Sequence, residues 1–332
     1  MYTSPEPDPA SAKCDPTQIP APPVQRLRPT PVILWATVGA LFLGLETHVA
    51  ARYLASGQLR LSTGDLGTMS TNRQSLLWTA QILVIAMIVP LIVWIARRCI
   101  IEHDMTVDAM LLLGFVSQAG LDPYFSPMGM LNSGSLHIPS WGEYLPAWSE
   151  LFGLPNPSTK VEPLLVTGAG YLTGLVFALT AAAVMRIWIL RRWPDLSGIR
   201  LVAAGLGTCA AIGLPIEIIW IQTGAYAYRE GVPVLTLFSA EWYQVPVYLP
   251  LTSGIFWYGT AWLIRHLYLH HGPDSTVFRG TKLLPPRART PVRALAVIGI
   301  LDVSVMLDCI AFRLFTLLPG SIETHHLPLP LI

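Results

Sequence analysis

The sequence predicts an all-α fold, a polytopic integral membrane helical bundle of about seven transmembrane helices with aromatic-rich caps between helices. Apolar side chains make up 52% of the 332 residues and charged side chains only 12%, whereas about a quarter of the residues of a soluble domain are charged. The mean hydropathy is +0.51. Apolar runs long enough to cross roughly 30 Å of hydrocarbon recur along the chain. These three observations exclude a soluble globular domain.

Proline and small polar residues fill positions 1–30, which contain no apolar run. Such a segment cannot bury enough apolar surface to offset the entropy that it would lose on ordering. We therefore expect a disordered, Pro-rich cytoplasmic tail at 1–30, a transmembrane helical domain at 31–318 and a short C-terminal tail at 319–332.

Seven apolar stretches follow the tail, and each is interpreted as a membrane-spanning helix. They run from Val32 to Leu54, Leu76 to Ala96, Val107 to Leu121, Leu164 to Leu190, Leu201 to Ile221, Val247 to Leu267 and Val292 to Leu314. In this arrangement fifteen of the 21 Lys and Arg residues fall on the side of the tail. Because cytoplasmic loops carry the excess of Lys and Arg, we expect the N-terminus in the cytoplasm.

Two segments between spans, 122–162 and 223–246, are rich in aromatic residues, among them Trp141, Tyr228 and Tyr243. Aromatic side chains at span ends commonly form a belt at the membrane interface. The alternative is an ordered cap, partly sunk in the interface, that closes over an apolar ligand. The sequence leaves both interpretations open.

Acidic residues occur inside the apolar spans, where an ionisable group needs a partner, a wet cavity or a function. Burial in a low dielectric disfavours the charged form, so a carboxyl there can keep a proton and act as a general acid. The acidic residues within spans are Glu46, Glu217, Asp302 and Asp308, and those at span ends are Asp108, Asp122 and Glu162.

A structural role stays open for two of these carboxyls, because each precedes a proline. Glu162 can cap free backbone N–H groups where a helix starts at Pro163. Asp122 can form a turn before Pro123.

Several other classes of function are excluded. The formal net charge of +1 leaves no basic surface for nucleic acid. His266 and His270 are spaced as two ligands on one helix face, but no carboxylate accompanies them, and solvated surface is the simpler explanation. The sequence has no dinucleotide, phosphate-loop or zinc-hydrolase motif. We therefore predict no metal site and no cofactor.

Several stretches resemble, in order, the AveC-like spirocyclase family of membrane proteins from actinobacterial polyketide pathways. They cover about two thirds of the chain, between residues 32 and 250. They are VILWATVGALFLGLET from Val32 to Thr47, DAML at Asp108, DP at Asp122, Asn132, SW at Ser140 and Trp141, Pro146 with Trp148, EPLL at Glu162, and AYAY from Ala225 to Tyr228 after Glu217. The chain departs from the family pattern at Gly213, where the resemblance implies an Asp one turn before Glu217.

The resemblance implies cyclisation of a dihydroxy-ketone polyketide to a spiroketal, with dehydration in some members, in a bacterial plasma membrane. In this reaction a hemiketal hydroxyl is protonated, water leaves through an oxocarbenium ion, and the second hydroxyl captures the cation. One carboxylic acid can donate the proton while a carboxylate stabilises the cation, as in glycoside chemistry. No redox cofactor or metal is required.

We therefore predict a membrane-embedded spirocyclase in which Asp122, Glu162 and Glu217 supply the acid and base functions. Its partners are a lipophilic polyketide substrate and the lipid bilayer. The residues that we expect to shape the substrate pocket are Asn132, Trp141, Tyr228 and Tyr243. Two alternatives remain: a transporter or export factor that uses Glu46, Glu217, Asp302 and Asp308 as a proton relay, and a non-catalytic membrane scaffold of the pathway.

Overall fold

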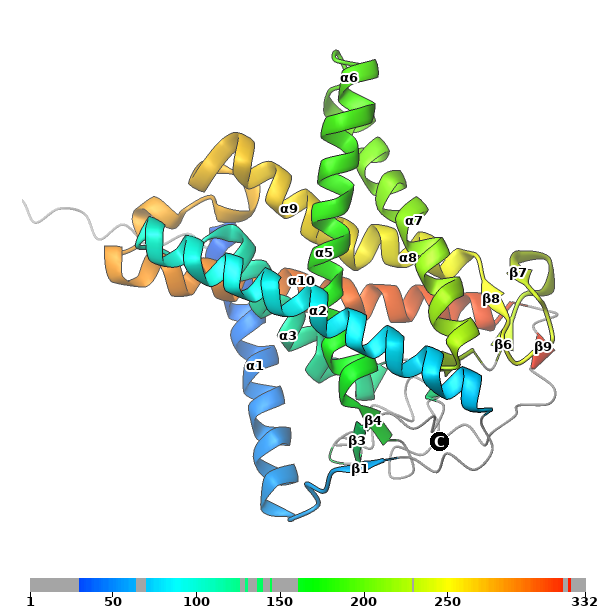
Figure 1. Cartoon of the computed structure of the whole chain (residues 1–332). Coiled ribbons are helices and arrows are strands. Elements are labelled where there is room, and N and C mark those ends of the chain that lie inside the picture. The colour runs from blue at the N-terminus through cyan, green and yellow to red at the C-terminus, as the bar shows by residue number, and fades with distance from the viewer. Residues whose placement is uncertain are drawn as a thin grey trace, which may run out of the picture.

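Helices occupy each of the seven apolar stretches (Figure 1). The computed structural model describes residues 30–63, 70–125, 129–130, 136–139, 144, 161–228, 230–318 and 322–323. Within these residues, five helices are long and apolar enough to cross a membrane. They are α1 (Pro31–Ala55), α2 (Thr71–Glu102), the segment Ala169–Arg192, α7 (Gly198–Thr223) and α10 (Pro286–Thr316).

The all-α membrane bundle is therefore confirmed, but a count of seven continuous spans is not. The third stretch forms α3 (Val107–Phe125), whose apolar part is shorter than the five long helices. The fourth is a composite of η3 (Leu164–Gly168), α5 (Ala169–Val184), η4 (Met185–Ile189) and α6 (Leu190–Arg192). Both η3 and η4 are π-helical turns, which insert a residue into the helical repeat.

The sixth stretch, which the sequence predicts as one span, is broken at Trp257 into α8 (Tyr248–Phe256) and α9 (Tyr258–His271). The backbone of Trp257 turns away from helical geometry, at φ −87° and ψ −92°. Side-chain hydroxyls bind the carbonyls freed by the break: Thr260 donates to Ile255, and Ser304 of α10 donates to Phe256. Such replacement bonds allow a helix to break inside an apolar bundle.

Short antiparallel strand pairs lie in the segments outside the helices. One three-stranded sheet has the order β1 (Ser62–Thr63), β3 (Leu136–Pro139), β4 (Val161–Pro163). The other pairs are β2 (Gly129–Met130) with β5 (Tyr226–Ala227), β6 (Glu230–Gly231) with β9 (Ile322–Glu323), and β7 (Thr236–Leu237) with β8 (Val245–Pro246). Short 3₁₀ turns complete the described elements: η5 (Pro233–Leu235), η6 (Gly272–Asp274), η7 (Thr276–Phe278) and η8 (Thr281–Leu283).

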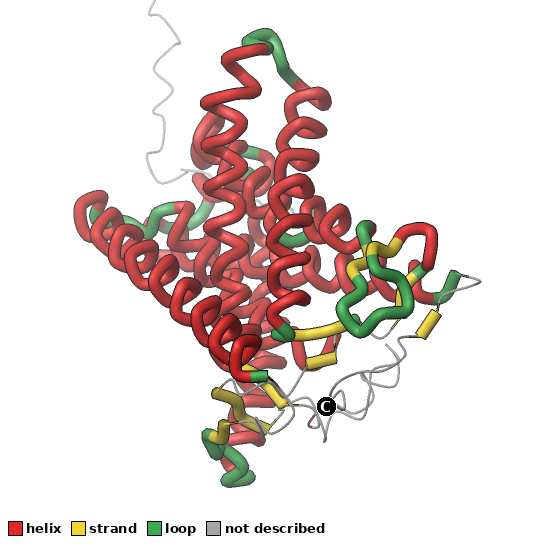
Figure 2. The backbone as a smooth tube through the Cα atoms, turned by 45° about the vertical axis from the view of Figure 1, so that its right-hand side comes forward, coloured by secondary structure: helices red, strands yellow, loops and turns green. Residues whose placement is uncertain are grey.

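The helices pack around a shared core. Figures 1 and 2 show α5–α6 and α7 side by side as a hairpin that projects beyond the other helices. Helix α1 packs against α10, where Gly39 and Gly299 bring the two backbones so close that a Cβ at either position would overlap the partner backbone. Buried side chains of α3, α5, α9 and α10 fill the centre, including Phe115, Leu175 and Leu301.

Ion pairs fasten one end of this core. The carboxyl of Asp108, at the start of α3, is 1% exposed and lies 2.7 Å from Arg265 Nε of α9 and 3.4 Å from Arg98 of α2. In the turn between α2 and α3, Asp104 accepts hydrogen bonds from Arg293 and Thr290 of α10. Partial burial opposes the charged form of Asp104, but these hydrogen bonds, the Met105 amide and the Arg293 charge together lower its pKa.

Replacing Asp104 by Asn should remove part of the acid sensitivity of the fold. A lowered pKa means that the folded protein binds this proton less readily than the unfolded chain does. The stabilisation by Asp104 is therefore present above the ordinary pKa of 3.8 and is lost as the pH falls through the folded-state value below it. Thermal unfolding in detergent should show a difference between wild type and Asp104→Asn at neutral pH that shrinks on acidification. The exposed Asp195 provides the control as Asp195→Asn; a constant difference for Asp104→Asn would contradict the expectation.

Candidate active site

A cavity of about 120 Å³ lies between α5, α7, α8, α9 and α10. Most of its walls are aromatic or aliphatic, which suits a largely apolar ligand with a few polar groups. The apolar side chains that line it include Tyr171, Phe177, Ile216, Trp220, Leu249, Trp257, Val305 and Phe312.

Two helices each present one stripe of residues to the cavity, at the three- and four-residue spacing of a single helix face. The stripe of α7 consists of Gly213, Ile216, Glu217 and Trp220. The stripe of α10 consists of Val305, Asp308, Cys309 and Phe312. Each stripe therefore contributes one carboxyl to an otherwise apolar wall.

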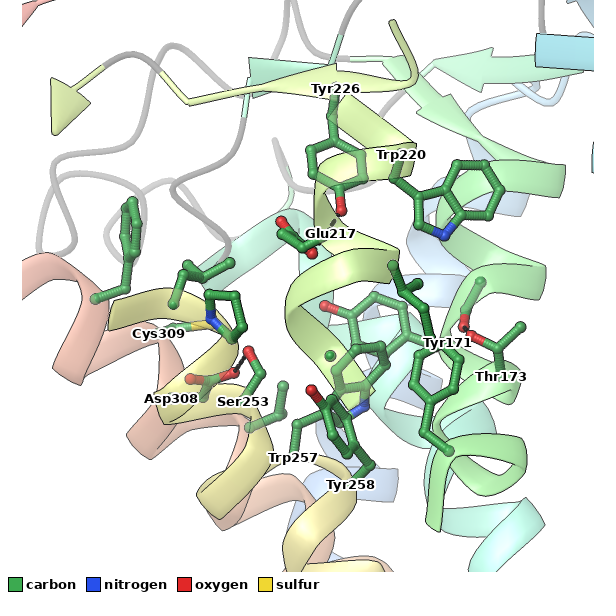
Figure 3. Close-up of a pocket in the computed structure, with 18 of the residues that line it drawn as sticks. Tyr171, Thr173, Glu217, Trp220, Tyr226, Ser253, Trp257, Tyr258, Asp308 and Cys309 are labelled. Atoms are coloured by element: carbon green, nitrogen blue, oxygen red, sulfur yellow. Dashed lines mark hydrogen bonds between the residues drawn. The ribbon is translucent and has the colours of Figure 1, made fainter. Parts of the chain in front are cut away.

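The Glu217 carboxyl is held by two phenols. Tyr226 Oη donates to Oε2 at 2.9 Å, and Tyr228 Oη donates to Oε1 at 2.5 Å. Figure 3 shows the Tyr226 ring pointing toward Glu217 from the strand above it. Tyr228 is fully buried and packs against the Phe312 ring at a centroid distance of 5.3 Å. Both carboxylate oxygens are thus oriented by donors, and both donors stabilise a negative charge on Glu217.

Local backbone geometry explains how these tyrosines reach Glu217. Helix α7 ends at Gly224, whose φ of 83° is left-handed and favours glycine. The chain then continues as β5, which begins at Tyr226, and Tyr228 follows directly after the strand, so that both phenols reach Glu217. Pairing of β5 with β2 and a 3.0 Å hydrogen bond from Gln244 Nε2 to the Tyr228 carbonyl fix this segment.

The Asp308 carboxyl has a different environment. Ser253 Oγ of α8 donates to Asp308 Oδ2 at 2.7 Å, and Figure 3 shows this pair beside the cavity. The described part of the chain contains no Lys, Arg or His within ion-pair distance of Asp308 or of Glu217. The described lining of the cavity therefore combines two carboxyls without a compensating cation.

A third phenol, that of Tyr258, stands directly after the break between α8 and α9 and reaches α7 at Gly213. A Cβ at position 213 would overlap the Tyr258 hydroxyl. Glycine is therefore required there for the phenol to lie against α7, one turn before Glu217.

Replacing Gly213 by Ala should displace the Tyr258 hydroxyl and destabilise the protein. Overpacking of a close-packed interior by one methyl group costs about 1–3 kcal/mol. Thermal unfolding in detergent measures this loss. Gly207→Ala is the matched control, because Gly207 is an exposed position on the same helix with no atom near the added Cβ. Equal unfolding temperatures for the two variants would contradict the steric explanation.

The structure brings together some of the residues that the sequence singled out. Glu217 and Tyr228 both line the cavity and contact each other. Tyr243 is not among the lining residues; its ring packs against Phe238 and Trp242 at centroid distances of 5.4 Å. It also packs against the apolar cluster that contains Tyr228.

The side chains of four other predicted residues are not described by the structure. Asp122 lies in the last part of α3 and Glu162 in β4, paired with Ile138, but the side chains of both lie outside the description. Asn132 and Trp141 lie outside the described residues.

Sequence reasoning did not assign Asp308, Ser253 or Tyr258 to the site. A signal for Asp308 exists, since it belongs to the apolar stripe of Val305 and Phe312 on α10. No local signal marks Ser253 or Tyr258, because their positions depend on the helix break at Trp257. Among the described residues, no group of three or more His, Cys, Asp or Glu side chains is arranged to hold a metal ion.

Comparison with known proteins identifies a family. The model of a family described as Spirocyclase AveC-like matches residues 102–328, which is more than half of the chain. No curated protein and no solved structure matches significantly.

Proposed function

The chain belongs to the AveC-like spirocyclase family, and from this premise we propose that it is a membrane-embedded enzyme that forms a spiroketal from a dihydroxy-ketone polyketide. The cavity carries the proposal, because it combines two carboxyls with aromatic walls inside an apolar bundle. Its substrate is lipophilic and partitions into the bilayer from which the cavity is filled.

The proposed reaction needs only proton transfer. A hydroxyl adds to the ketone to give a hemiketal, whose hydroxyl is then protonated and leaves as water. The resulting oxocarbenium ion is captured by the second hydroxyl, and the proton released in that step returns to the enzyme. The product is the spiroketal plus one water, with no net redox change and no net consumption of protons.

Asp308 is proposed as the proton donor. Its Oδ2 accepts a hydrogen bond from Ser253, and its Oδ1 has no hydrogen-bond partner among the described residues, so its ionised form is stabilised less than that of a carboxyl with a strong donor on each oxygen. An apolar environment without a cation also favours a neutral acid. Ser253 fixes the orientation of the carboxyl toward the cavity.

Glu217 is proposed as the carboxylate that stabilises the oxocarbenium ion and accepts the final proton. Donation by Tyr226 and Tyr228 to its two oxygens supports an ionised form before the cation develops. Such pre-oriented charge in a site that excludes water is a major source of rate enhancement. The faces of Trp257 and Tyr171, with centroids 5.3 Å apart, add cation–π attraction for the positive intermediate.

Asp122 and Glu162 remain part of the proposal as further acid–base residues. Leu121, the neighbour of Asp122, packs in one cluster with Tyr171 and Val305, and both of these line the cavity. Glu162 comes shortly before α5, which supplies Tyr171 and Thr173 to the cavity. The residues proposed to contact the substrate are Asn132, Trp141 and Tyr243. The N-terminus is proposed to lie in the cytoplasm of a bacterial cell.

The decisive experiment follows conversion of a synthetic dihydroxy-ketone to its spiroketal by detergent-solubilised protein, with product stereoisomers separated by chiral chromatography. We expect the wild type to raise both the rate and the stereoselectivity above those of a protein-free detergent blank. Equal rate and stereoselectivity in the blank would overturn the enzymatic proposal. Movement of an unchanged substrate across vesicles containing the protein would favour a transporter instead.

A further inference from the structure

A second acidic cluster lies apart from the cavity, where α1, α3 and α10 meet. Ser117 Oγ of α3 lies 2.7 Å from Glu46 Oε1 of α1 and 2.9 Å from Asp302 Oδ2 of α10. None of these three residues lines the cavity. The cluster therefore needs an explanation of its own.

If both contacts of Ser117 are hydrogen bonds, the cluster needs a proton besides that of the serine. A serine hydroxyl has one proton and can donate only one hydrogen bond at a time. Both contacts of Ser117 are at hydrogen-bond distance, so if Ser117 donates to one carboxyl it must accept from the other. Two ionised carboxylates would leave one contact without a hydrogen.

The environment of Asp302 indicates which carboxyl holds that proton. Asp302 is 0% exposed, and its Oδ1 has no hydrogen-bond partner within the described residues. A buried carboxylate needs a hydrogen-bond donor to each oxygen. In a neutral carboxylic acid, an unpaired carbonyl oxygen costs much less free energy to bury. Glu46 is only partly buried, so a negative charge costs less on Glu46 than on the fully buried Asp302.

Among the residues that the structure describes, no positive charge compensates the cluster. The described part of the chain places no Lys, Arg or His within ion-pair distance of Glu46 or Asp302. Several charged groups of these helices are engaged elsewhere, among them Asp108 of α3 with Arg265, Arg293 of α10 with Asp104, Asp308 of α10 with Ser253, and Arg52 of α1 over the Tyr144 ring. The oxygen–oxygen distances below 3 Å fit hydrogen bonds through protons that the serine and a carboxyl supply.

We propose that Glu46, Ser117 and Asp302 form a proton-binding site in which Asp302 is a carboxylic acid that donates to Ser117, and Ser117 donates to Glu46. The bound proton fastens α1 to α3 and α10 beside the close contact of Gly39 with Gly299. Loss of the proton puts two like charges on facing helices. The site is independent of the proposed spirocyclase activity.

Infrared spectroscopy of the purified full-length protein tests the proposal, because a protonated carboxyl has a carbonyl band distinct from that of a carboxylate. We expect Asp302→Asn to lose one carboxylic-acid band at neutral pH. The exposed Asp195 gives the matched control, and Asp195→Asn should lose none. An unchanged carboxylic-acid region in Asp302→Asn would overturn the proposal.

A second variant keeps the proposal testable if Asp302→Asn does not fold. Ser117→Ala removes the acceptor of the Asp302 hydrogen bond but keeps both carboxyls, so we expect the carboxylic-acid band to remain and to shift in frequency. Identical spectra of Ser117→Ala and wild type would contradict the hydrogen-bond chain.

Stability provides an independent readout. Where the folded state holds a proton that the unfolded chain has released, the unfolding equilibrium constant rises as the pH rises, by up to about tenfold per pH unit. We expect this dependence to be weaker in Asp302→Asn or, if that variant does not fold, in Glu46→Gln. The same pH dependence in wild type and the variant would contradict the site.

Discussion

Glu217→Gln is expected to lower the rate of spiroketal formation by about 10²–10⁴-fold, the usual contribution of a positioned acid–base group. Glutamine keeps the shape of the side chain and can still accept from Tyr226 or Tyr228. It cannot carry a negative charge or accept the final proton. The loss should therefore appear in the rate of the bound complex, with substrate affinity little changed.

Single-turnover assays with the synthetic dihydroxy-ketone measure this effect. Glu46→Gln is the matched control, because it makes the same chemical change in another helix and Glu46 lies outside the cavity. A Glu217→Gln enzyme that is as fast and as stereoselective as wild type would show that Glu217 has no acid–base role.

Asp308→Asn is expected to lower the same rate by about 10²–10³-fold, because the proposed acid then has no proton to give to the departing hydroxyl. The amide still fits beside Ser253, so the cavity should keep its shape. The rate of the variant should also lose the pH dependence that reports ionisation of the acid.

A comparison along one helix controls for effects on the fold. Asp302→Asn changes a buried aspartate six residues earlier on α10, outside the cavity. If Asp308→Asn and Asp302→Asn reduce the rate equally, the loss reflects the integrity of α10 rather than proton donation.

Much of the fold could be predicted from the sequence because membrane helices depend on local composition. Each predicted span became helical, since apolar runs of that length can satisfy their backbone only as helices. The break at Trp257 could not be predicted, because it depends on hydroxyls supplied by Thr260 and by Ser304 of another helix.

The sequence predicts only those residues of the candidate site whose type is unusual for their position. Glu217 stood out as a carboxylate within an apolar span, and Tyr228 as part of the motif that follows it. Asp308 was equally visible, yet its partner Ser253 lies 55 residues away in the chain. Because pairing between distant helices is set by packing, the sequence could not show which of four intramembrane carboxyls share one cavity.

The position of Gly213 also gains a physical explanation. The family resemblance implies an Asp at this position, and the structure places the Tyr258 hydroxyl against the bare backbone there. An aspartate side chain at 213 would collide with that phenol, so the two groups exclude each other.

Every described residue that lines the cavity comes from position 170 or later, and the family match begins at residue 102. Helices α1 and α2 contribute none of the lining. For protein engineering, the cavity-lining segments and the first two helices are therefore suited to different kinds of substitution. Substitutions meant to redirect ring size or product stereochemistry belong among the cavity-lining residues of α5 and α7–α10 and at the proposed contacts Asp122, Asn132, Trp141 and Glu162. Substitutions meant to improve expression or tolerance of a new detergent belong in the first two helices.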